Sequence, residues 1–579
     1  HDHCGESGAI GAGIEAARLW HNGRETTFIG LEEINDISYK STTNEGTRCY
    51  FCKNKCLRTF IDVKINKPQV EEQVQAQSEP KIEEKKFKSK VPLEAGAKRL
   101  IVGNSCEKGL VEDVNDMRVI KKGLDAKLEA SPNLVEESAN DVFKSFKPDI
   151  VADNIPKVLL TSAVKERASK MAARSEIRIG MPRVLNMFSL TPVFTGYFES
   201  LGIPFKNFVF SDFTSEKMYK EGAKRGSIDP CFPSKVAIPH VHNLLYEKNK
   251  RKPMDIIFFP MIDNFPTPLT GTEDCRACPT VTTTPEAVKA AFIKEGDIFK
   301  DKGIKFLDTF VNIAEKGLFS KQMYEQFKDI LGLSWKENKR AIEAGYESLE
   351  KYESSMRRKA RALIDQLEKE NRFGIVLLGR TYHNDPGINH EIMVEFQKLG
   401  YPVFTQECLP LDADILEKVF GDDVKKGIIT DPMDIADVWK NSYSENTNRK
   451  VWGAKYTARH PNLIALELSN FKCGHDAPIY TVIEEIVENS GTPYFNFKDL
   501  DENKPSGSIK IRVETIHYFL KRYREDMINE QVAKDDIQEK LKEYRLELEK
   551  KVLLEDFHTP AQTNGKVLSQ QTATIGEPV

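Results

Sequence analysis

The chain has 579 residues, of which 40% are hydrophobic and 30% charged, so we expect a globular protein of several domains. Its 84 Lys and Arg nearly balance its 88 Asp and Glu, which gives no reason to expect nucleic acid or an anionic membrane as a partner. No apolar run in the sequence approaches the roughly 18 residues of a transmembrane helix.

The N-terminal sequence HDHCGESGAIGAG lacks both a Met and the basic-then-apolar order of a signal peptide. We therefore expect a piece of a longer polypeptide that is located in the cytoplasm. Ten cysteines in a large chain without such a signal are typical of thiolate metal ligands rather than of disulfides.

The first part of the chain has the pattern of a helix, cysteine-rich strands and connectors. GAIGAGIEAARLW, residues 8–20, predicts a helix punctuated by Gly, and residues 25–65 are rich in β-forming residues. Residues 66–90 are polar and charged, which is typical of a flexible insertion, and ordered sequence resumes at RLIVGNSCEKG. We expect a separate N-terminal segment in 1–24, a cysteine-rich cluster domain in 25–120 and a helical connector in 121–175.

From Glu176 onward, predicted strands alternate with predicted helices in two rounds. The first round has strands in EIRIGMPRV, PFKNFVFS and MDIIFFPMI, and the second has them in RFGIVLLGR, YPVFTQE, NLIALELSNF and TPYFNFKDLD. Such alternation predicts parallel α/β sheets, and two rounds predict two Rossmann-like lobes. The boundaries that we expect are 176–336 for the first lobe, 337–371 for a connecting helix, 372–525 for the second lobe, 526–557 for a C-terminal helix and 558–579 for a disordered tail.

The stretch RCYFCKNKCLRTF holds Cys49, Cys52 and Cys56. The spacing C-x2-C-x3-C lets one loop direct several sulfurs at one centre, and thiolates bind zinc or iron–sulfur clusters. Cys106, in the Gly-flanked turn GNSCEKG, is the best candidate for a fourth ligand, because the cost of closing a long loop grows slowly with its length. These residues by themselves favour zinc and iron–sulfur about equally.

A second set of cysteines is dispersed along the two expected lobes. Most of them follow a predicted strand or lie in a loop, where ligands bind in open α/β sheets. If the two lobes face each other at these edges, the five thiols converge on a metal site. The alternative is that they are small buried hydrophobic residues. The members of this set are Cys231, Cys275, Cys278, Cys408 and Cys473.

Several polar residues stand close to these cysteines or after a buried strand. GRTYHNDPGINHE carries Arg380, His383 and His390, which can bind substrate or supply a proton, although Asn-Asp-Pro-Gly is also strong turn chemistry. His475 and Asp476 adjoin Cys473 and are placed to tune a bound cluster. Lys235, near Cys231, is a candidate contact for a cluster or a phosphate. We expect His240 and His242 to be core residues.

Five motifs together resemble the large CoA-substrate-specific enzyme activase proteins. These are related to the 2-hydroxyacyl-CoA dehydratases, the benzoyl-CoA reductases and the double-cubane cluster proteins. The resemblance covers about residues 25–525. In full-length relatives, ATPase modules precede this region, and HCGESGAIGAGIEAARLW resembles the closing helix of such a module, so that 1–24 would be its tail. The motifs are CFPSKVAIPHVHNLL, ACPTVTTTPE, GRTYHNDPGINHE, ARHPNLIALELSNFKCGHDAPIY and DENKPSGSIKIRVETI.

The resemblance implies two Rossmann-like lobes with an oxygen-sensitive cluster between them, preceded by a small iron–sulfur domain. Cys231, Cys278 and Cys473 match the cluster-ligand segments, and Cys275 is an additional thiol beside Cys278. Cys408 falls where relatives of the dehydratase type can carry a cysteine after the corresponding strand. The cluster is then either [4Fe–4S] or a double-cubane [8Fe–9S] group. The resemblance also favours iron–sulfur at the first set, as a relay [4Fe–4S] cluster on Cys49, Cys52, Cys56 and Cys106.

The function that the resemblance implies is that of an iron–sulfur reductase component. It would accept low-potential electrons from ATP-dependent activator modules, fused upstream or separate, and reduce a small molecule or an acyl-CoA. His383, His390 and His475 are the candidate proton donors, and Lys235, Arg380 and Asp476 the candidate cluster or substrate contacts. The alternatives are a 2-hydroxyacyl-CoA dehydratase and a non-enzymatic metal-binding or cluster-binding scaffold. A homodimer is an expectation from the relatives.

Overall fold

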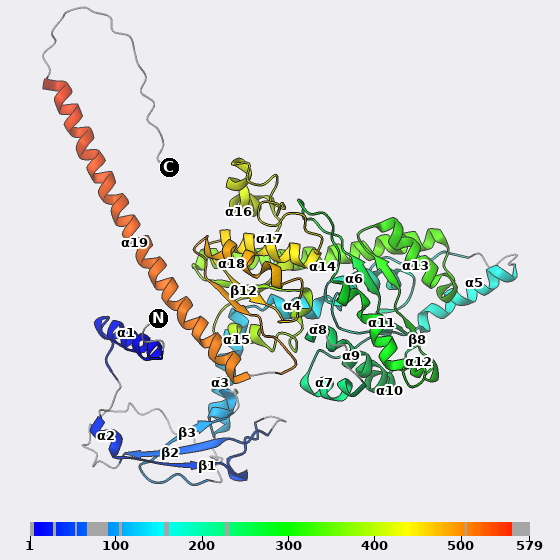
Figure 1. The fold of residues 1–579 in the computed structure, drawn as a ribbon, viewed down its shortest axis with the longest axis horizontal. Helices are drawn as coiled ribbons and strands as arrows, with labels where there is room; N and C mark the ends of the chain where they lie inside the picture. Colours follow the sequence, from blue (N-terminus) through cyan, green and yellow to red (C-terminus); the bar gives the residue numbers. More distant parts are fainter. Residues whose placement is uncertain are drawn as a thin grey trace, which may run out of the picture. The chain divides into compact units, whose positions relative to one another are not determined.

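The computed structural model of the chain describes residues 5–26, 31–51, 55–65, 91–103, 107–155, 161–225, 231–503 and 506–558. The chain divides into two compact units, His1–Val513 and Glu514–Val579, and the boundary falls within the long helix α19 (Ser506–His558). The first unit is a mixed α/β structure (Figure 1). Among its described residues it contains two four-stranded parallel sheets, a parallel pair of strands and a three-stranded antiparallel sheet.

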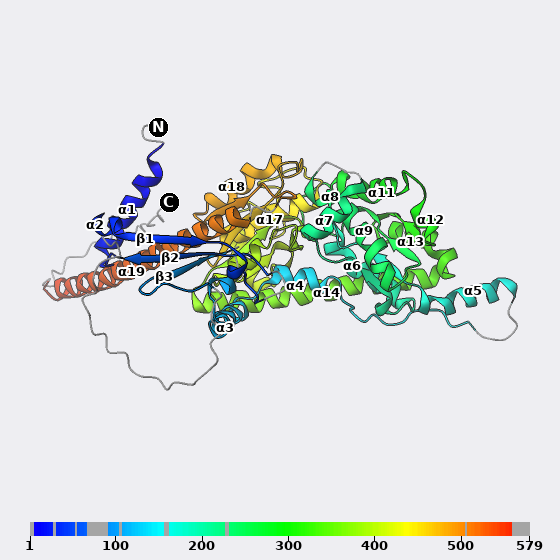
Figure 2. The ribbon, with the colours of Figure 1, turned by 90° about the horizontal axis from the view of Figure 1, so that it is seen from below.

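The N-terminal part contains a helix that covers the segment expected to be helical, and a small antiparallel sheet. The strands follow the order β1-β2-β3, and Figure 2 shows them side by side. Thr59 pairs with Val102, so the residues before β2 and those after β3 lie at the same end of the sheet. The expected insertion 66–90 lies outside the described residues. The elements are α1 (Ser7–His21), α2 (Leu31–Asn35), β1 (Ile37–Thr42), β2 (Thr59–Ile65) and β3 (Lys98–Val102).

The first parallel sheet has the strand order β5-β4-β6-β8. Three of its strands lie in the segments that the sequence predicts. The strand β7 begins at the end of the predicted strand MDIIFFPMI, whereas β8 and β9 are short strands that the pattern did not indicate. The strands are β4 (Ile179–Met181), β5 (Phe208–Phe210), β6 (Ile256–Phe258), β7 (Met261–Asn264), β8 (Lys305–Leu307) and β9 (Phe310–Asn312). The helices of this part are α6 (Met187–Ser200), α7 (Glu216–Gly222), α8 (Phe232–Lys235), α9 (Ala237–Asn243), α10 (Asn249–Arg251), α11 (Pro279–Ile293), α12 (Ile298–Asp301) and α13 (Lys316–Leu331).

The second parallel sheet has the order β11-β10-β12-β13, and all four strands lie in segments predicted from the sequence. Every residue of β10 and β12 is buried, as expected for central strands of a parallel sheet. The strands are β10 (Gly374–Leu378), β11 (Val403–Thr405), β12 (Leu463–Leu468) and β13 (Tyr494–Phe497). In Figure 1, α15 (Ile392–Lys398), α17 (Glu445–Arg459) and α18 (Tyr480–Glu488) gather around β12; α16 (Ala413–Lys425) follows β11 in the chain.

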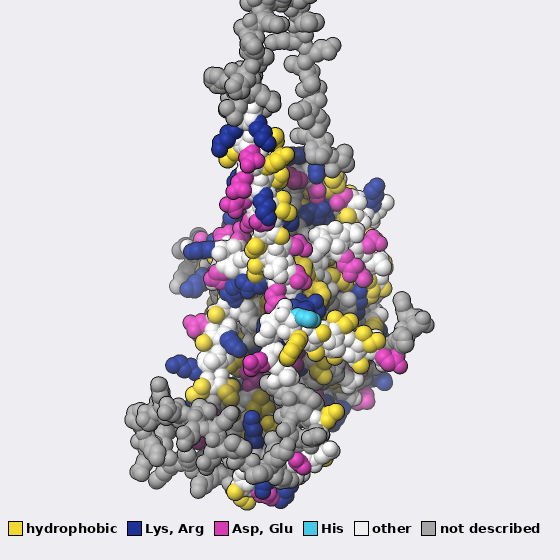
Figure 3. Space-filling model, turned by 90° about the vertical axis from the view of Figure 1, so that its left-hand side faces the viewer, with side chains coloured by type: hydrophobic (Ala, Val, Ile, Leu, Met, Phe, Trp, Pro, Cys, Tyr) yellow, Lys and Arg dark blue, Asp and Glu magenta, His cyan; other side chains and the backbone are white. Residues whose placement is uncertain are grey.

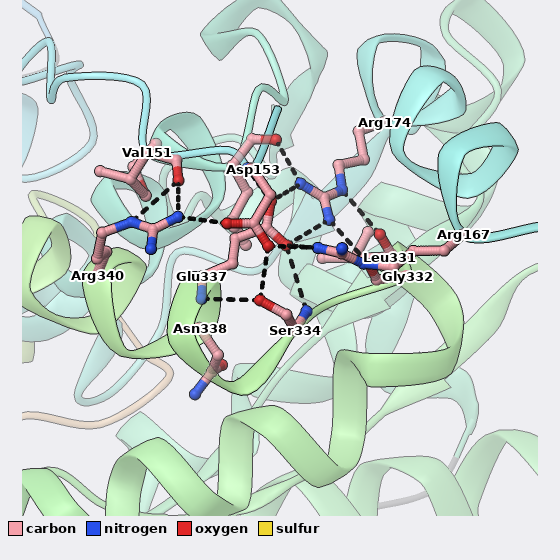
Figure 4. A network of polar contacts seen from close by, with 12 residues as sticks. Val151, Asp153, Arg167, Arg174, Leu331, Gly332, Ser334, Glu337, Asn338 and Arg340 are labelled. Carbon is pink, nitrogen blue, oxygen red and sulfur yellow. Dashed lines mark hydrogen bonds and ion pairs between the residues drawn. The ribbon is translucent and has the colours of Figure 1, made fainter. Parts of the chain in front are cut away.

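The long helix α14 (Trp335–Glu370) covers the segment in which we expect a connecting helix. It begins with a capping box, in which Ser334 and Glu337 satisfy each other's backbone N–H groups. It packs along α6, where a Cβ on Gly196 would lie 2.3 Å from Ser348 Oγ, so only glycine permits this approach. Its first turn joins a buried polar network in which Glu337 pairs with Arg174 (Figure 4).

Three further helices connect the antiparallel sheet to the first parallel sheet, and α19 begins earlier than the sequence pattern indicates, at Ser506. None of the described helices is long and apolar enough to cross a membrane. On the face seen in Figure 3, Lys and Arg side chains are interspersed with Asp and Glu, in keeping with the balanced composition. The expected tail 558–579 lies, after His558, outside the described residues. The three helices are α3 (Val114–Ala130), α4 (Leu134–Asp141) and α5 (Ser162–Ala173).

Candidate metal centre

The main candidate centre is built from four side chains that lie after strands or at the starts of helices. Arg380 follows β10 and Cys473 follows β12; these strands are parallel neighbours, so both residues emerge at the same edge of the second sheet. Cys231 and Cys278 are the N-cap residues of α8 and α11, and a Pro in the first helical turn favours each helix start. Cys278 thus stands at the start of the 15-residue helix α11.

The Arg380 guanidinium lies among these thiols. It interacts electrostatically with Cys231, Cys278 and Cys473. Burial raises the pKa of the Cys231 and Cys473 thiols, and the Arg380 cation acts against that increase. The Arg380 side chain is only 1% exposed, and its Nη2 donates to Asp476 Oδ1 at 2.8 Å. Its Nε and Nη1 are buried and have no hydrogen-bond partner among the described residues.

A buried charge network holds Arg380 in place. Asp476 accepts from Ser469 Oγ at 2.6 Å and lies 3.4 Å from Lys450 Nζ, in addition to its bond with Arg380. Lys450 in turn pairs with Glu467 at 2.6 Å, and both side chains are fully buried. Burial would raise the pKa of Asp476, but the cations Arg380 and Lys450 outweigh that effect and hold its pKa well below the ordinary value. Asp476 is therefore ionised and fixes the orientation of the guanidinium.

Cys275 and Cys408, which we expected in the same group, have other surroundings. Cys275 interacts with Glu445 and Asp274, and its Sγ lies 4.0 Å from Asn264 Nδ2. The buried Cys408 donates from Sγ to its own helical turn, at the Thr405 carbonyl oxygen 3.0 Å away. It lines a small cavity of about 30 Å³ together with Glu407 and Arg449. The five dispersed thiols thus form one group of three around Arg380 and two separate thiols.

Thiols are the usual ligands of iron–sulfur clusters, so the residue types around Arg380 fit such a group. All described cysteines are free thiols, and among the described residues no group of three or more His, Cys, Asp or Glu is arranged to hold one metal ion. In a cluster each thiolate binds a different iron, so the ligand sulfurs stand farther apart than the ligands of one ion. The unpartnered N–H groups of Arg380 also suit an anionic group with several sulfur acceptors.

The three histidines expected to be proton donors differ in their surroundings. His383 is buried, and its Nδ1 accepts the backbone N–H of Arg380 at 2.9 Å, so the ring proton is on Nε2. Burial lowers the pKa of His383 to about 3, which makes it a neutral residue at ordinary pH. His475 is half-buried, stands two residues after Cys473 and contacts Ser444 Oγ at 2.9 Å; burial lowers its pKa as well.

His390 and Lys235 flank the segment around Cys231. The His390 ring stacks on Phe232, the residue after Cys231, with centroids 5.9 Å apart and planes 10° from parallel. Lys235 Nζ lies 3.3 Å from Glu502, a residue beyond β13, and therefore forms an ion pair between distant segments. His240, expected in the core, is fully buried between Ser211 and Thr214.

Only part of the first cysteine set can be placed. The backbone N–H of Cys49 donates to the Cys56 carbonyl at 2.8 Å, so these two residues are neighbours at the end of the antiparallel sheet. Arg58 donates to the carbonyls of Gly109 and Val111, which brings the segment after β3 to the same end. Cys52 and Cys106 lie outside the described residues.

Two residues of the network were missed by sequence reasoning. Glu467 interrupts the apolar run LIALEL, and a charged residue inside a fully buried strand is a signal that could have been used. Lys450 lies in α17, whose sequence ENTNRKVWGAKYTAR shows no clear apolar face although most of the helix is buried. The surrounding elements determine the burial of Lys450, which therefore cannot be recognised from the sequence of α17 alone.

The fold and this site define an α/β protein with parallel sheets and a thiol-rich centre at their strand ends. Residues 178–409 match the family model described as "CoA enzyme activase uncharacterised domain". This part of the chain is therefore similar to the CoA enzyme activase family, which confirms the resemblance seen in the motifs and indicates an enzyme-related role. The match contains β4 to β11, Cys231, Cys278 and Arg380, and ends before Cys473. A search of curated proteins finds no match to the chain.

Proposed function

We propose that this protein is an iron–sulfur reductase component that takes low-potential electrons from an ATP-dependent activator and passes them to a small or CoA-linked substrate. The observation that carries this proposal is the grouping of the Cys231, Cys278 and Cys473 thiols around the buried, partly unpartnered Arg380. A cluster bound there would supply one-electron transfer at low potential. Three thiols favour a single [4Fe–4S] cluster, since a double cubane needs about twice as many.

The chain's own residues would hold and shield such a group. The Cys231 and Cys278 thiols come from helix starts beside the first sheet, and Cys473 comes from the edge of the second, so the site draws on both sheets. The buried network of Asp476, Lys450 and Glu467 restrains Arg380, so this side chain has a fixed orientation in the site. This arrangement supports the expectation of two lobes with the reacting group between them.

We further propose that Cys49, Cys52, Cys56 and Cys106 hold a second, relay [4Fe–4S] cluster in an N-terminal iron–sulfur domain. The pairing of Cys49 with Cys56, and the Arg58 contacts that bring residues 109–111 to the same end of the sheet, support this assignment. Four cysteine thiolates would complete the coordination of a cluster without a ligand from elsewhere.

Of the three candidate proton donors, His475 has the most suitable position. It is partly exposed, so protons can reach it from solvent, and it stands beside Cys473. His383 is held neutral by burial and by its bond to the Arg380 backbone, so it orients the turn instead. A dehydratase would use the same site, and net electron consumption during turnover distinguishes a reductase from it.

The experiment is to purify the protein without oxygen, to measure iron, sulfide and zinc per chain, and to record EPR spectra after reduction by dithionite. About eight irons per chain with two distinguishable signals support a relay cluster and a second cluster. About four irons with one signal contradict the two-site assignment. Zinc with little iron and no signal contradicts the redox function and leaves a metal-stabilised scaffold.

A further inference from the structure

The Arg380 guanidinium has hydrogen-bonding capacity that the described part of the chain does not use. Nη2 is fixed by Asp476, whereas Nε and Nη1 are buried without a partner among the described residues. A buried N–H group without an acceptor costs about 1–3 kcal/mol, and more when it is charged. In native proteins the acceptor for such a group is an ordered water, a bound molecule or an ion.

The charges around Arg380 indicate what kind of acceptor fits. Arg380, Lys450 and Lys498 are three cations, and the carboxylates that pair with them are Asp476 and Glu467. The network therefore has more positive than negative charge, and beyond it Arg380 interacts electrostatically with Tyr382 and with the Cys473 and Cys278 thiols of the candidate centre. An anionic group with several acceptor atoms suits both the charge and the unused hydrogen-bond donors.

We propose that Arg380 is the residue that sets the reduction potential at this centre, by donating its Nε and Nη1 hydrogens to the sulfur atoms of the cluster. This inference rests on the proposed function. Adding an electron makes a cluster more negative, and a buried cation with N–H donors stabilises the more negative state. Arg380 therefore raises the potential, so that the centre accepts electrons from its donor more readily. Asp476 acts through Arg380 by holding the guanidinium in its orientation.

Arg183 offers a matched control because it is also largely buried and also has an unpartnered Nε among the described residues. Its guanidinium lies over the rings of Phe143, Phe210 and Phe213. Burial lowers the pKa of Arg183, and Asp212 and Asp385 act against that decrease. Replacing Arg183 thus removes a positive charge of the same kind from the same region of the protein without touching the thiol group.

The experiment is an anaerobic redox titration of the full chain, followed by EPR, for wild type, Arg380→Gln, Arg380→Lys and Arg183→Gln. We expect the midpoint potential of one signal to become more negative in Arg380→Gln, to stay nearer to wild type in Arg380→Lys, and not to move in Arg183→Gln. The relay signal serves as an internal reference, because its potential should be the same in all four proteins.

Three outcomes overturn the inference. An Arg380→Gln protein with both signals and unchanged potentials shows that Arg380 does not tune the centre. An equal shift of the midpoint potential in Arg183→Gln would show that loss of a positive charge elsewhere in the protein has the same effect as loss of Arg380. If Arg380→Gln loses the EPR signal of the centre beside Arg380, the Arg380→Lys protein distinguishes two explanations. A signal retained in Arg380→Lys near the wild-type potential supports the inference. Loss of iron from both variants would show instead that Arg380 is a structural support. Absence of iron in the wild type instead rejects the proposed function, which separates the two failures.

Discussion

Thr214 and Asp385 join the two parallel sheets through a buried pair of hydrogen bonds. The hydroxyl of Thr214, in the loop after β5, donates to Asp385 Oδ2 at 2.8 Å, and its backbone N–H donates to the same oxygen at 3.2 Å. Asp385 lies in the turn that starts at Arg380, so this contact fixes the turn against the first sheet. His240 Nε2 approaches the same hydroxyl at 2.9 Å and therefore donates to it, since the Thr214 hydrogen is used by Asp385.

The first prediction concerns the pH dependence of this contact. Burial raises the pKa of Asp385 from its ordinary value of 3.8 to about 6, although Thr214 and Gly387 donate to it. A carboxyl whose pKa is raised by folding stabilises the folded state fully below 3.8, and this contribution is lost as pH rises through 6. The loss amounts to about 3 kcal/mol, because one pKa unit corresponds to about 1.4 kcal/mol.

His240 opposes this dependence, because burial lowers its pKa to about 3 and acid therefore destabilises the folded state. Arg183 and Asp212 are the other charges near it. The variant Asp385→Asn isolates the carboxyl: the stability of wild type relative to the variant should fall between pH 4 and pH 7, measured by urea unfolding. A constant difference across this range would show that Asp385 does not titrate there.

The second prediction concerns the polar network at the start of α14 (Figure 4). Glu337 is fully buried and pairs with Arg174 at 2.8 Å, and it also accepts the backbone N–H of Asp153 at 2.9 Å. Glu337→Gln leaves a buried guanidinium without its counter-charge, so we expect a loss of about 3–5 kcal/mol in the free energy of unfolding. Glu343→Gln on the same helix removes an exposed pair with Lys316 and should cost less than about 1 kcal/mol. Similar losses in both would refute this account of the network.

The third prediction tests the close contact between α6 and α14. In Gly196→Ala the new methyl group would lie 2.3 Å from Ser348 Oγ and 2.9 Å from the Ala344 carbonyl oxygen, so the helices must separate. We expect a loss of about 1–3 kcal/mol, visible as a lower melting temperature. Gly317→Ala, in α13, meets open space and should raise stability by up to about 1 kcal/mol because alanine favours the helix. A neutral Gly196→Ala would mean that the two helices are not tightly packed.

Much of the secondary structure could be predicted from the sequence. The strands of the second sheet are runs of apolar residues next to turn residues, such as GIVLL and LIALEL, and α14 has a long amphipathic pattern with a capping box at its start. The strands β8 and β9, of three residues each, were not indicated by the sequence pattern. Their formation depends on neighbours that are distant in the sequence.

The candidate centre could be predicted only in outline. The rule that ligands meet at the ends of parallel strands correctly indicates where Cys473 and Arg380 emerge. It does not separate Cys275 and Cys408 from the other thiols. The surroundings of Cys275 depend on Glu445 and Asn264, which belong to other elements, and Cys408 is buried and bonds within its own turn. The neutral state of His383 likewise follows from burial, which the turn sequence GRTYHNDPG does not reveal.

The central claim is that the thiols of Cys231, Cys278 and Cys473 hold an iron–sulfur cluster, and a pair of neighbouring variants tests it most directly. Iron per chain and EPR spectra would be measured for Cys278→Ser and Cys275→Ser after anaerobic purification. We predict that Cys278→Ser loses one signal and about four irons while the relay signal stays, and that Cys275→Ser keeps both signals. Full iron content with both signals in Cys278→Ser would contradict the account, because no cluster would then depend on a thiol next to Arg380.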